Sequence, residues 1–468
     1  MTGMALRAAL TLADVLAGTG GALAVPARPD LALTTVSIDS RTLEAGALFV
    51  AVKGPTFDGH DFLAEAAARG ARAALVQRDV AKAAGLAIVR VPDTVKGLSD
   101  LARHVRRQAA IPIVGLTGSV GKTTTKDMTA HLLATQGPVL KTEGNLNNQY
   151  GLPLTLLRLR PEHVAAVLEM GMSAPGEIRA LSDLAEPDVA AITRVAPVHL
   201  EFFPSVDAIA DAKAEILEGL RPGGAAVLNG DDPRLRAIGE RFRGRVVWFG
   251  RDARFEVSAG AVRATASGTT FDLGVGGRTV DVALPLAGPH FVEDFLAAAA
   301  VAHVLGVAPE AMAEAAASLR AARHRGELLR LGREVTVLDD CYNSSPEALE
   351  AAVEALSLVP GRRRVAVLGD MLELGPTAGA LHRAAGRSLA GRVEAVFGVG
   401  PLAAGIVEGA REAGMEPGAL LHFAATGDAA AALPDLVRPG DAVLVKASRG
   451  MRLEAVVEAL VARFGEEA

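Results

Sequence analysis

The chain of 468 residues is long enough for about two to four domains, each with its own hydrophobic core. Half of its residues are hydrophobic and 22% are charged, which excludes a disordered or fibrous protein, and its net charge of −6 argues against a protein that binds nucleic acid by neutralising phosphates. A single cysteine, Cys341, excludes an internal disulfide and predicts a cytoplasmic protein; we expect it to be a small buried apolar residue rather than a nucleophile.

The N-terminus carries Arg7 ahead of an apolar stretch, and in this it resembles a secretory signal. Asp14 interrupts the stretch, however, and Thr11 with Asp14 fits a helix N-cap followed by an acidic first turn. We therefore predict a short folded helix that ends at Gly18. No uncharged run elsewhere reaches the roughly 18 residues of a membrane span, so no span is predicted.

Residues 1–105 are predicted to form a small α/β domain, because short apolar runs at 47–52 and 73–76 alternate with helical stretches. Two polar loops, 39–41 and 53–60, follow apolar runs in this domain. Loops at strand ends are favoured positions for binding residues. Turn formation and surface charge explain these residues equally well, so both interpretations stay open.

A second domain, predicted at 106–320, begins with the stretch 115–125, which reads GLTGSVGKTTT. It lies between an apolar run and a segment with helical spacing, which is the strand, glycine-rich turn and helix start of a phosphate-binding loop. Lys122 adds a positive charge to the backbone amides of the turn, and Thr123 is placed to put its hydroxyl on a magnesium ion. The first glycine of the common motif is replaced by Leu116, so the loop is a compact variant.

The rest of this domain reads as a parallel, doubly wound sheet, because continuous apolar runs at 164–168, 189–192, 225–228 and 246–249 are separated at first by helical stretches. Residues 255–286 change to short segments broken by glycines, which predicts antiparallel ribbons, and an alanine-rich helix is expected at about 292–304.

Three side chains of this domain could carry chemistry. Glu169 ends an apolar run beside the phosphate loop and favours a magnesium ligand over a solvated carboxylate. His199 taken alone is more often a packed or capping histidine, and Lys213 taken alone is more often a solvated lysine on a helix.

The third domain, predicted at 321–468, again alternates apolar runs with helical stretches, at 335–338, 364–368, 395–397 and 442–445. No G-x-G-x-x-G follows a strand there, so a nicotinamide site is unsupported. The predicted fold class is therefore α/β with three domains, of which the central one is a P-loop parallel-sheet ATPase domain and the C-terminal one is Rossmann-like.

Motifs in all three domains resemble the ATP-dependent Mur ligases, which build the peptide stem of bacterial cell-wall precursors. They are DSRTLEAGALFVAVKGPTFDGHDF (39–62), TGSVGKTTTK (117–126), TEGNLNNQYGLP (142–153), LEMGMSAPGEI (168–178), PVHLEFFPS (197–205), AKAEIL (212–217), LNGDD (228–232), DDCYNSSPEA (339–348), LGDMLELG (368–375) and GDAVLVKASRGMRLE (440–454). The motifs of the third domain are similar to those of the member that adds D-alanyl-D-alanine to a UDP-muramoyl tripeptide. Ser344, Ser345 and Ala447 are mild departures from its pattern.

The resemblance implies a set of site residues. ATP would be held by Thr117, Gly118, Ser119, Gly121, Lys122, Thr123, Thr124, Asn148, His290, Asp294, Arg325 and Asp340. Two magnesium ions would be held by Thr123, Glu169, His199 and Lys213, with Lys213 carbamylated, and the catalytic residues would be Lys122, Glu169, His199 and Lys213. The substrates would contact Ser40 and Arg41 at the uridine end, Asn145 at the transferring group, and Tyr342, Asn343, Lys446 and Arg449 at the dipeptide or acyl-phosphate end.

The implied protein is a cytoplasmic monomer that binds UDP-MurNAc-tripeptide through its first domain and D-Ala-D-Ala through its third, and that needs neither nucleic acid nor a membrane span. Domain closure would shield an acyl-phosphate intermediate from water, with hinges near 105–111 and 319–325. The identity of the third stem residue, lysine or diaminopimelate, stays open.

One departure concerns adenine recognition, for which the family uses asparagines before the alanine-rich helix. This chain has Phe291 and Asp294 there. An ionised Asp294 can only accept hydrogen bonds, whereas an asparagine amide also donates, and Phe291 could compensate by stacking on the base.

Two alternatives to this function stay open. The first is a relative that adds the third stem residue, or a glutamate to folate. The tripeptide-forming relative usually shows a DYAH-type motif where this chain has DCYNSSP, and an acidic D-N-P-R motif that this sequence lacks. A P-loop NTPase switch without ligation would need neither the YNSSP and KASR motifs of the third domain nor a carbamate on Lys213.

Overall fold

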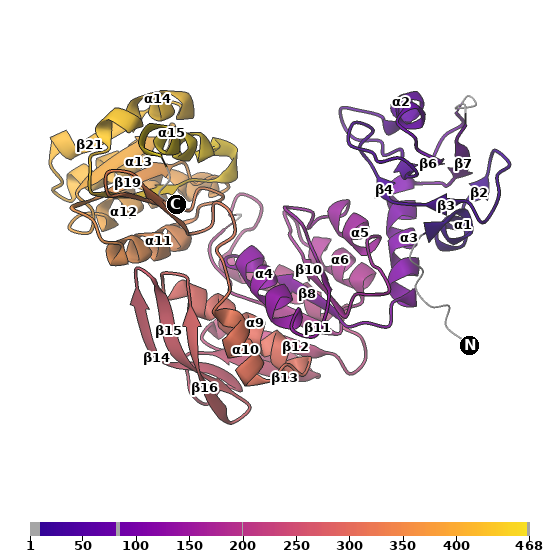
Figure 1. The fold of residues 1–468 in the computed structure, drawn as a ribbon, viewed down its shortest axis with the longest axis horizontal. Coiled ribbons are helices and arrows are strands. Elements are labelled where there is room, and N and C mark those ends of the chain that lie inside the picture. The colour runs from indigo at the N-terminus through magenta and orange to yellow at the C-terminus, as the bar shows by residue number, and fades with distance from the viewer. Residues whose placement is uncertain (1–9, 81–84, 199, 466–468) are drawn as a thin grey trace. The chain divides into compact units, whose positions relative to one another are not determined.

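A computed structural model describes residues 10–80, 85–198 and 200–465 (Figure 1). Three larger sheets follow one another along the chain, with five strands between Ala22 and Arg90, nine between Ile113 and Leu284, and six between Glu327 and Lys446. A short pairing of β1 (Leu10–Thr11) with β3 (Ala32–Leu33) precedes them. The predicted α/β class is confirmed. The chain divides into two compact units, residues 1–117, 133–191 and 212–226, and residues 118–132, 192–211 and 227–468.

The five-stranded sheet in the first unit has strands β4 to β7 parallel and β2 antiparallel at one edge. In sheet order they are β2 (Ala22–Leu23), β7 (Ala87–Arg90), β6 (Ala73–Val76), β5 (Leu48–Val50) and β4 (Val36–Ser37). Helices α1 (Leu12–Thr19) and α3 (Thr94–Gln108) pack on one face and α2 (Leu63–Ala68) on the other, because successive strand residues point to opposite faces.

The N-terminal helix α1 has the predicted capping box, in which Thr11 and Asp14 bond each other's backbone amides. Its predicted end at Gly18 is wrong, because the helix continues to Thr19 and Gly20 takes the left-handed conformation that closes it.

The nine-stranded sheet has the order β16-β15-β14-β13-β12-β11-β8-β10-β9. Its strands are β8 (Ile113–Thr117), β9 (Val139–Lys141), β10 (Ala165–Glu169), β11 (Val189–Ile192), β12 (Ala225–Asn229), β13 (Arg245–Gly250), β14 (Val257–Thr265), β15 (Gly268–Val275) and β16 (Arg278–Leu284). Strand β10 pairs in parallel with β8 and β9, whereas β14, β15 and β16 form the predicted antiparallel ribbons.

The helices between and after these strands include the alanine-rich segment, which extends from His290 to Val304 and confirms the predicted helix. They are α4 (Lys122–Leu133), α5 (Gly151–Leu156), α6 (Glu177–Ala185), α7 (Val206–Ala214), α8 (Pro233–Arg241), α9 (His290–Val304) and α10 (Pro309–Ala316).

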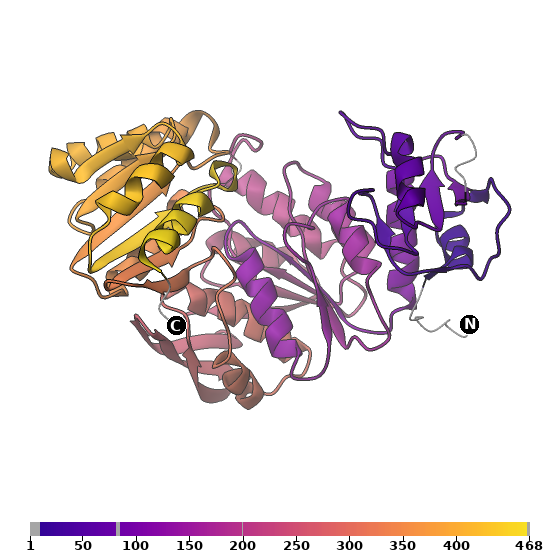
Figure 2. The ribbon, with the colours of Figure 1, turned by 45° about the horizontal axis from the view of Figure 1, so that its top comes forward.

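The six-stranded sheet is parallel except for β17, which pairs antiparallel with β18 at one edge. In sheet order its strands are β17 (Glu327–Leu331), β18 (Val335–Asp339), β22 (Asp441–Lys446), β19 (Arg363–Gly369), β20 (Ala395–Val399) and β21 (Leu420–Phe423). Helices α11 (Pro346–Leu358), α12 (Ala378–Ser388) and α13 (Ala404–Glu412) cover one face, and α14 (Thr426–Leu436) and α15 (Glu454–Phe464) cover the other (Figure 2). This is the doubly wound arrangement that the sequence predicts for the third domain.

Within the described ranges, no helix is both long and apolar enough to cross a membrane.

Candidate active site

The phosphate loop joins a buried strand to a helix, as predicted. Strand β8 ends at Thr117 and helix α4 begins at Lys122. The buried Thr117 hydroxyl donates a hydrogen bond of 2.9 Å to the carbonyl of Met170, directly after β10. Strands β8 and β10 are parallel neighbours, so Glu169 at the end of β10 lies opposite Leu116 near the end of β8. Both residues therefore lie at the carboxyl-terminal ends of the strands, where the phosphate loop begins.

The two glycines of the loop are required by the residues around them. A Cβ atom on Gly118 would lie 1.9 Å from the Thr193 hydroxyl oxygen, and one on Gly121 would lie 2.0 Å from Oδ1 of Asp294. The φ angle of Gly121 is +82°, a conformation that side chains disfavour. No other residue type fits either position without rearrangement.

The segment that follows β11 supports the loop backbone. The Thr193 hydroxyl donates to the carbonyl of Val120 at 2.6 Å, and the Ser119 amide donates to the carbonyl of Arg194 at 2.7 Å. The Asn229 amide in turn donates to the carbonyl of Thr193 at 3.0 Å. The sequence prediction did not include Thr193, although a polar residue directly after the apolar run 189–192 is the kind of signal that marks a strand end at a site.

Lys122 folds back over the loop. Its ammonium donates to the carbonyl of Gly118 at 2.8 Å and to that of Ser119 at 3.4 Å. These are the loop residues that the sequence assigns to ATP, so the second unit brings together the predicted positions from Gly118 to Thr123.

Two of the predicted metal ligands lie in the first unit and are buried. Glu169 is 3% exposed and Lys213, in α7, is 2% exposed, which excludes the alternative of a solvated lysine. The Glu169 carboxylate accepts a hydrogen bond of 3.0 Å from the amide of Asn147. A buried carboxylate oriented in this way fits a hard cation such as magnesium, which prefers oxygen ligands. The predicted ligand His199 lies outside the described residues.

The asparagines of the loop after β9 have different surroundings. The Asn148 side-chain oxygen accepts from the amides of Tyr150 and Gly151, at 3.1 and 3.0 Å, and so caps the start of α5. Asn145 is exposed. The sequence prediction named these two residues and missed Asn147, the one that contacts Glu169.

The start of α9 lies against the phosphate loop. Asp294 accepts a hydrogen bond of 3.3 Å from the Thr125 hydroxyl, and burial raises the pKa of its carboxyl well above the usual value. Phe291 is 3% exposed, with its ring 4.2 Å from that of His290, which leaves little of the Phe291 ring for a base. Burial, followed by the charge of Lys446, lowers the pKa of His290 to about 4, so its ring is neutral near pH 7.

The predicted residues of the third domain form one cluster. The Lys446 ammonium donates to the Asp340 carboxylate at 2.5 Å and to the carbonyl of Asn343 at 3.0 Å. The guanidinium of Arg325 lies 4.1 Å from the ring centroid of Tyr342, and that of Arg449 lies 5.4 Å from it. Asp340 directly follows β18 and Lys446 ends β22. The two residues meet because these strands are parallel neighbours.

The two residues predicted at the uridine end differ in exposure. Ser40 is buried and its hydroxyl donates to Glu65 at 3.1 Å, whereas the Arg41 side chain is exposed and pairs with Asp39 at 2.8 Å. The hydrogen bond from Arg41 holds the pKa of Asp39 at about 2.

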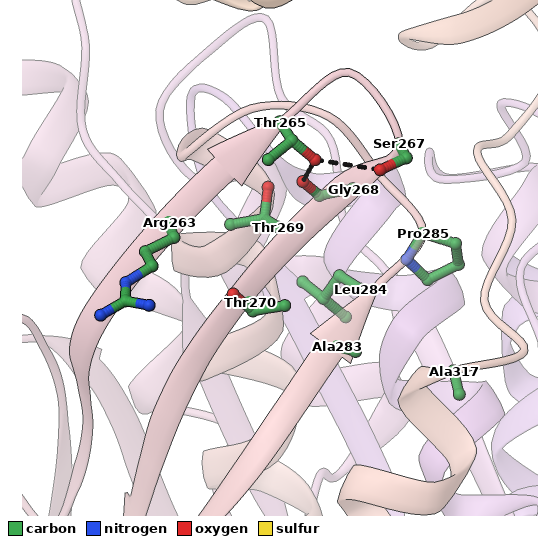
Figure 3. Close-up of a pocket in the computed structure, with 10 residues that line it drawn as sticks. All are labelled: Arg263, Thr265, Ser267, Gly268, Thr269, Thr270, Ala283, Leu284, Pro285 and Ala317. Atoms are coloured by element: carbon green, nitrogen blue, oxygen red, sulfur yellow. Dashed lines mark hydrogen bonds between the residues drawn. The ribbon is translucent and has the colours of Figure 1, made fainter.

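Two other features do not provide a site. Three possible metal-ligand atoms lie within 4.8 Å of one another, on His324, Asp339 and Cys341. His324, however, is hydrogen-bonded to Asp339 at 2.6 Å. Burial also raises the pKa of the Cys341 thiol, which disfavours the thiolate that a metal requires. A cavity of about 290 Å³ opens at the ends of the β14–β16 ribbons (Figure 3) and contains none of the predicted site residues. It is lined by Arg263, Thr265, Ser267, Gly268, Thr269, Thr270, Ala283, Leu284, Pro285 and Ala317.

Comparison with known proteins places this site in a family. Residues 32–106 match the model for the Mur ligase family, catalytic domain, residues 116–302 the Mur ligase middle domain, and residues 324–449 the Mur ligase, glutamate ligase domain. The UDP-N-acetylmuramoyl-tripeptide–D-alanyl-D-alanine ligase of Bacillus subtilis is 36% identical over 98% of this chain and 99% of that protein, and the Escherichia coli enzyme of the same name is 38% identical over 92% and 94%.

Solved structures agree with these matches. A crystal structure of MurF from Acinetobacter baumannii has a TM-score of 0.89 at 32% identity, covering 98% of this chain and 100% of that one. MurF ligase from Thermotoga maritima in complex with ADP has a TM-score of 0.81 at 33% identity, covering 92% and 97%. The chain therefore belongs to the Mur ligase family.

Proposed function

We propose that the chain is an ATP-dependent ligase that joins D-alanyl-D-alanine to UDP-N-acetylmuramoyl-tripeptide, with release of ADP and phosphate. The observation that carries the proposal is similarity along nearly the whole chain, 36% over 98% of its length, to a relative named for this reaction. The phosphate loop, the buried Glu169 and the cluster around Lys446 supply the types of residue that the reaction needs.

The reaction proceeds through an activated carboxylate. The terminal carboxylate of the tripeptide attacks the γ-phosphorus of ATP, so that an acyl–phosphate bond forms and the bond to ADP breaks. The amine of D-alanyl-D-alanine then attacks the acyl carbon, loses a proton and displaces phosphate, which leaves an amide. Water would hydrolyse the intermediate, so domain closure excludes it.

The loop binds the nucleotide in this scheme. Its backbone amides and Lys122 contact the phosphates, with Lys122 exchanging its contact to the Gly118 carbonyl for phosphate oxygens. Thr117, Ser119, Thr124 and Asn148 complete the phosphate contacts, and His290, Asp294, Arg325 and Asp340 contact the rest of the nucleotide. Asn145, Tyr342, Asn343 and Arg449 position the two reacting substrates, and Ser40 and Arg41 face the uridine.

Magnesium, when bound, neutralises the charges of the two anions that must meet. Thr123 and Glu169 would hold one ion, and His199 with Lys213 a second. The burial of Lys213 supports a carbamate at this position, because a buried ammonium is costly to desolvate and a carbamate is an oxygen ligand.

The same proposal assigns the substrates to domains. Residues 1–105 bind the UDP-substrate, 106–320 bind ATP, and 321–468 bind D-alanyl-D-alanine, in a cytoplasmic protein that acts as a monomer. Three domains that close around their substrates need no partner subunit.

The test is phosphate release from ATP with each substrate omitted in turn. We expect release only when UDP-muramoyl tripeptide and D-alanyl-D-alanine are both present, and tripeptides with lysine or diaminopimelate then identify the stem. Release with neither substrate indicates a nucleotide switch, and strict dependence on another amino acid indicates a different ligase. Full activity of Lys213→Ala, unaffected by bicarbonate or chloride, would exclude the carbamate.

A further inference from the structure

The side chain of Asn147 contacts the carboxylate at the end of β10. Its Nδ2 donates to Oε1 of Glu169 at 3.0 Å, and Glu169 itself is 3% exposed. The backbone amide of Glu169 donates to the Thr142 hydroxyl, also at 3.0 Å. The carboxylate is thus approached by a neutral donor from a loop that belongs to a different part of the sequence.

Asn147 is held in place on both sides of its side chain. Its carbonyl accepts from the amide of Gly171 at 2.9 Å, and its amide donates to the carbonyl of Asn145 at 2.8 Å. A Cβ atom on Gly171 would lie 3.0 Å from Oδ1 of Asn147, so the glycine leaves the room that the asparagine amide occupies. The loop and the strand end are joined by backbone as well as side-chain bonds, which fixes the direction of the Asn147 donor.

We propose that Asn147 is a positioning residue that orients the Glu169 carboxylate toward a divalent cation. This rests on the proposed function, in which Glu169 holds magnesium. A hydrogen bond to one carboxylate oxygen limits rotation of the group, and metal-binding carboxylates are commonly held by such outer hydrogen bonds. An amide NH₂ group suits this role, because it donates to the carboxylate but has no charge to repel the metal.

The neighbouring asparagines do not duplicate this contact. Asn148 uses its side-chain oxygen to cap α5, and the exposed Asn145 supplies its backbone carbonyl to Asn147. Of the three asparagine side chains in this loop, that of Asn147 donates to the Glu169 carboxylate.

The test measures metal affinity rather than turnover alone. Binding of Mn²⁺ to the ADP complex is followed by electron paramagnetic resonance for wild type and Asn147→Leu, which removes the donor and keeps the size. We expect Mn²⁺ to bind about 10–100-fold more weakly to the variant, while ADP affinity in EDTA stays within about twofold. Ligation by the variant should recover at high magnesium. Gln149→Leu, which removes an exposed amide two positions along the same loop, is the matched control and should change neither quantity.

A double-mutant cycle separates the proposal from the metal assignment on which it rests. In a Glu169→Gln background, Asn147→Leu should have no further effect on Mn²⁺ affinity, because the carboxylate it orients is gone. If Asn147→Leu binds Mn²⁺ as tightly as wild type while Glu169→Gln binds it more weakly, the role of Asn147 is overturned and the metal role of Glu169 is kept. Unchanged affinity in Glu169→Gln overturns the metal role of Glu169 and the proposal with it, whereas the two-substrate assay tests ligation independently. Asn147→Ser replaces the leucine variant if thermal melting shows that the latter is unfolded.

Discussion

The Asp340 carboxylate and the Lys446 ammonium form a hydrogen-bonded ion pair, with 2.5 Å between Oδ2 and Nζ, at the carboxyl-terminal ends of β18 and β22. Lys446 is 2% exposed, and its ammonium also donates to the carbonyl of Asn343. The sequence resemblance assigns Asp340 to the nucleotide and Lys446 to the second substrate. Because the two side chains are paired, a change at either residue should affect both nucleotide binding and binding of the second substrate.

Lys446→Met should destabilise the protein, because it leaves Asp340 without its cation at a position where burial already raises the pKa of the carboxyl. Removing one partner of a buried pair costs about 3–5 kcal/mol, which urea unfolding can measure. The double variant Asp340→Asn, Lys446→Met removes both charges and should recover most of the stability without recovering ligation. Equal stability of the single and double variants would show that the unpaired Asp340 is not the cause of the loss.

Asp294→Asn should keep or tighten ATP binding. Oδ1 of Asp294 lies against Gly121 of the phosphate loop, so the substitution removes a potential negative charge beside the phosphates and supplies an amide donor. We expect a gain of about 1 kcal/mol, or roughly fivefold in the dissociation constant of an ATP analogue by calorimetry. Thr125→Val, which removes only the hydroxyl bonded to Asp294, should give no gain. A large rise in the ATP Michaelis constant of Asp294→Asn would contradict this interpretation.

The same variant should change how stability depends on pH. Burial raises the pKa of Asp294 above its value in the unfolded chain, so the folded protein retains that proton to higher pH. Wild-type stability is therefore lost as pH rises from the ordinary carboxyl range through the raised pKa. The asparagine cannot ionise, so the free energy of unfolding of Asp294→Asn should exceed that of wild type by an amount that grows over this interval. A difference that is constant with pH would show that Asp294 does not titrate in this way.

The fold was predictable wherever strands are continuously apolar. The runs 73–76 and 189–192 coincide with β6 and β11, because strands buried on both faces carry no polar residue that could blur their ends. The end of α1 was not predictable, because Gly18 and Gly20 are both acceptable stops and only the packed structure selects Gly20.

The site was predictable where residues act within a motif, and less so where they act through space. Gly118 and Gly121 belong to a recognisable loop, but the atoms that require them, on Thr193 and Asp294, are distant in sequence. The sequence predicts Asn145 and Asn148 rather than Asn147 as site residues, because an asparagine-rich loop does not indicate which amide faces Glu169. The sequence specifies the motif, whereas the supporting contacts depend on tertiary structure.

Arg106 should be a stability determinant of the segment that the sequence predicts as a hinge. It is 2% exposed and donates to the carbonyls of Ala185 and Glu186, both at 2.7 Å, and to the carboxylate of Asp188 at 3.1 Å. Arg106→Leu would leave the two carbonyls at the end of α6 without this donor, whereas Asp188 would keep its bonds from the Ile113 amide and from Arg221. We expect a loss of about 3–5 kcal/mol in urea unfolding.

The adjacent Arg107 is the matched control for Arg106. Its side chain is 64% exposed and pairs with Glu186 at 2.6 Å. An exposed ion pair contributes about 0–1 kcal/mol, so Arg107→Leu should be nearly neutral. Similar losses for both variants would mean that burial of Arg106 does not fix this segment, and bending at 105–111 would then meet no local resistance.

Gly121→Ala should abolish tight nucleotide binding for two separable reasons. The φ angle of +82° is strained for any side chain, and the new Cβ would lie 2.0 Å from Oδ1 of Asp294. The strain alone costs about 1–2 kcal/mol, or roughly 5–30-fold in ATP affinity if it is released by moving the loop. Calorimetry with an ATP analogue should therefore show a loss beyond tenfold.

The two reasons can be separated with a second substitution and a control glycine. Gly121→Ala combined with Asp294→Ala removes the clash but not the strain, so its ATP affinity should lie between those of Gly121→Ala and wild type. Gly277 has a φ angle of +84° and no atom within 4 Å of an added Cβ, so Gly277→Ala carries the strain without the clash or the loop. It should lower stability by about 1–2 kcal/mol and leave ATP affinity unchanged. If Asp294→Ala gave no recovery, backbone strain alone would explain the requirement for glycine at position 121, and the carboxylate of Asp294 would not shape the loop.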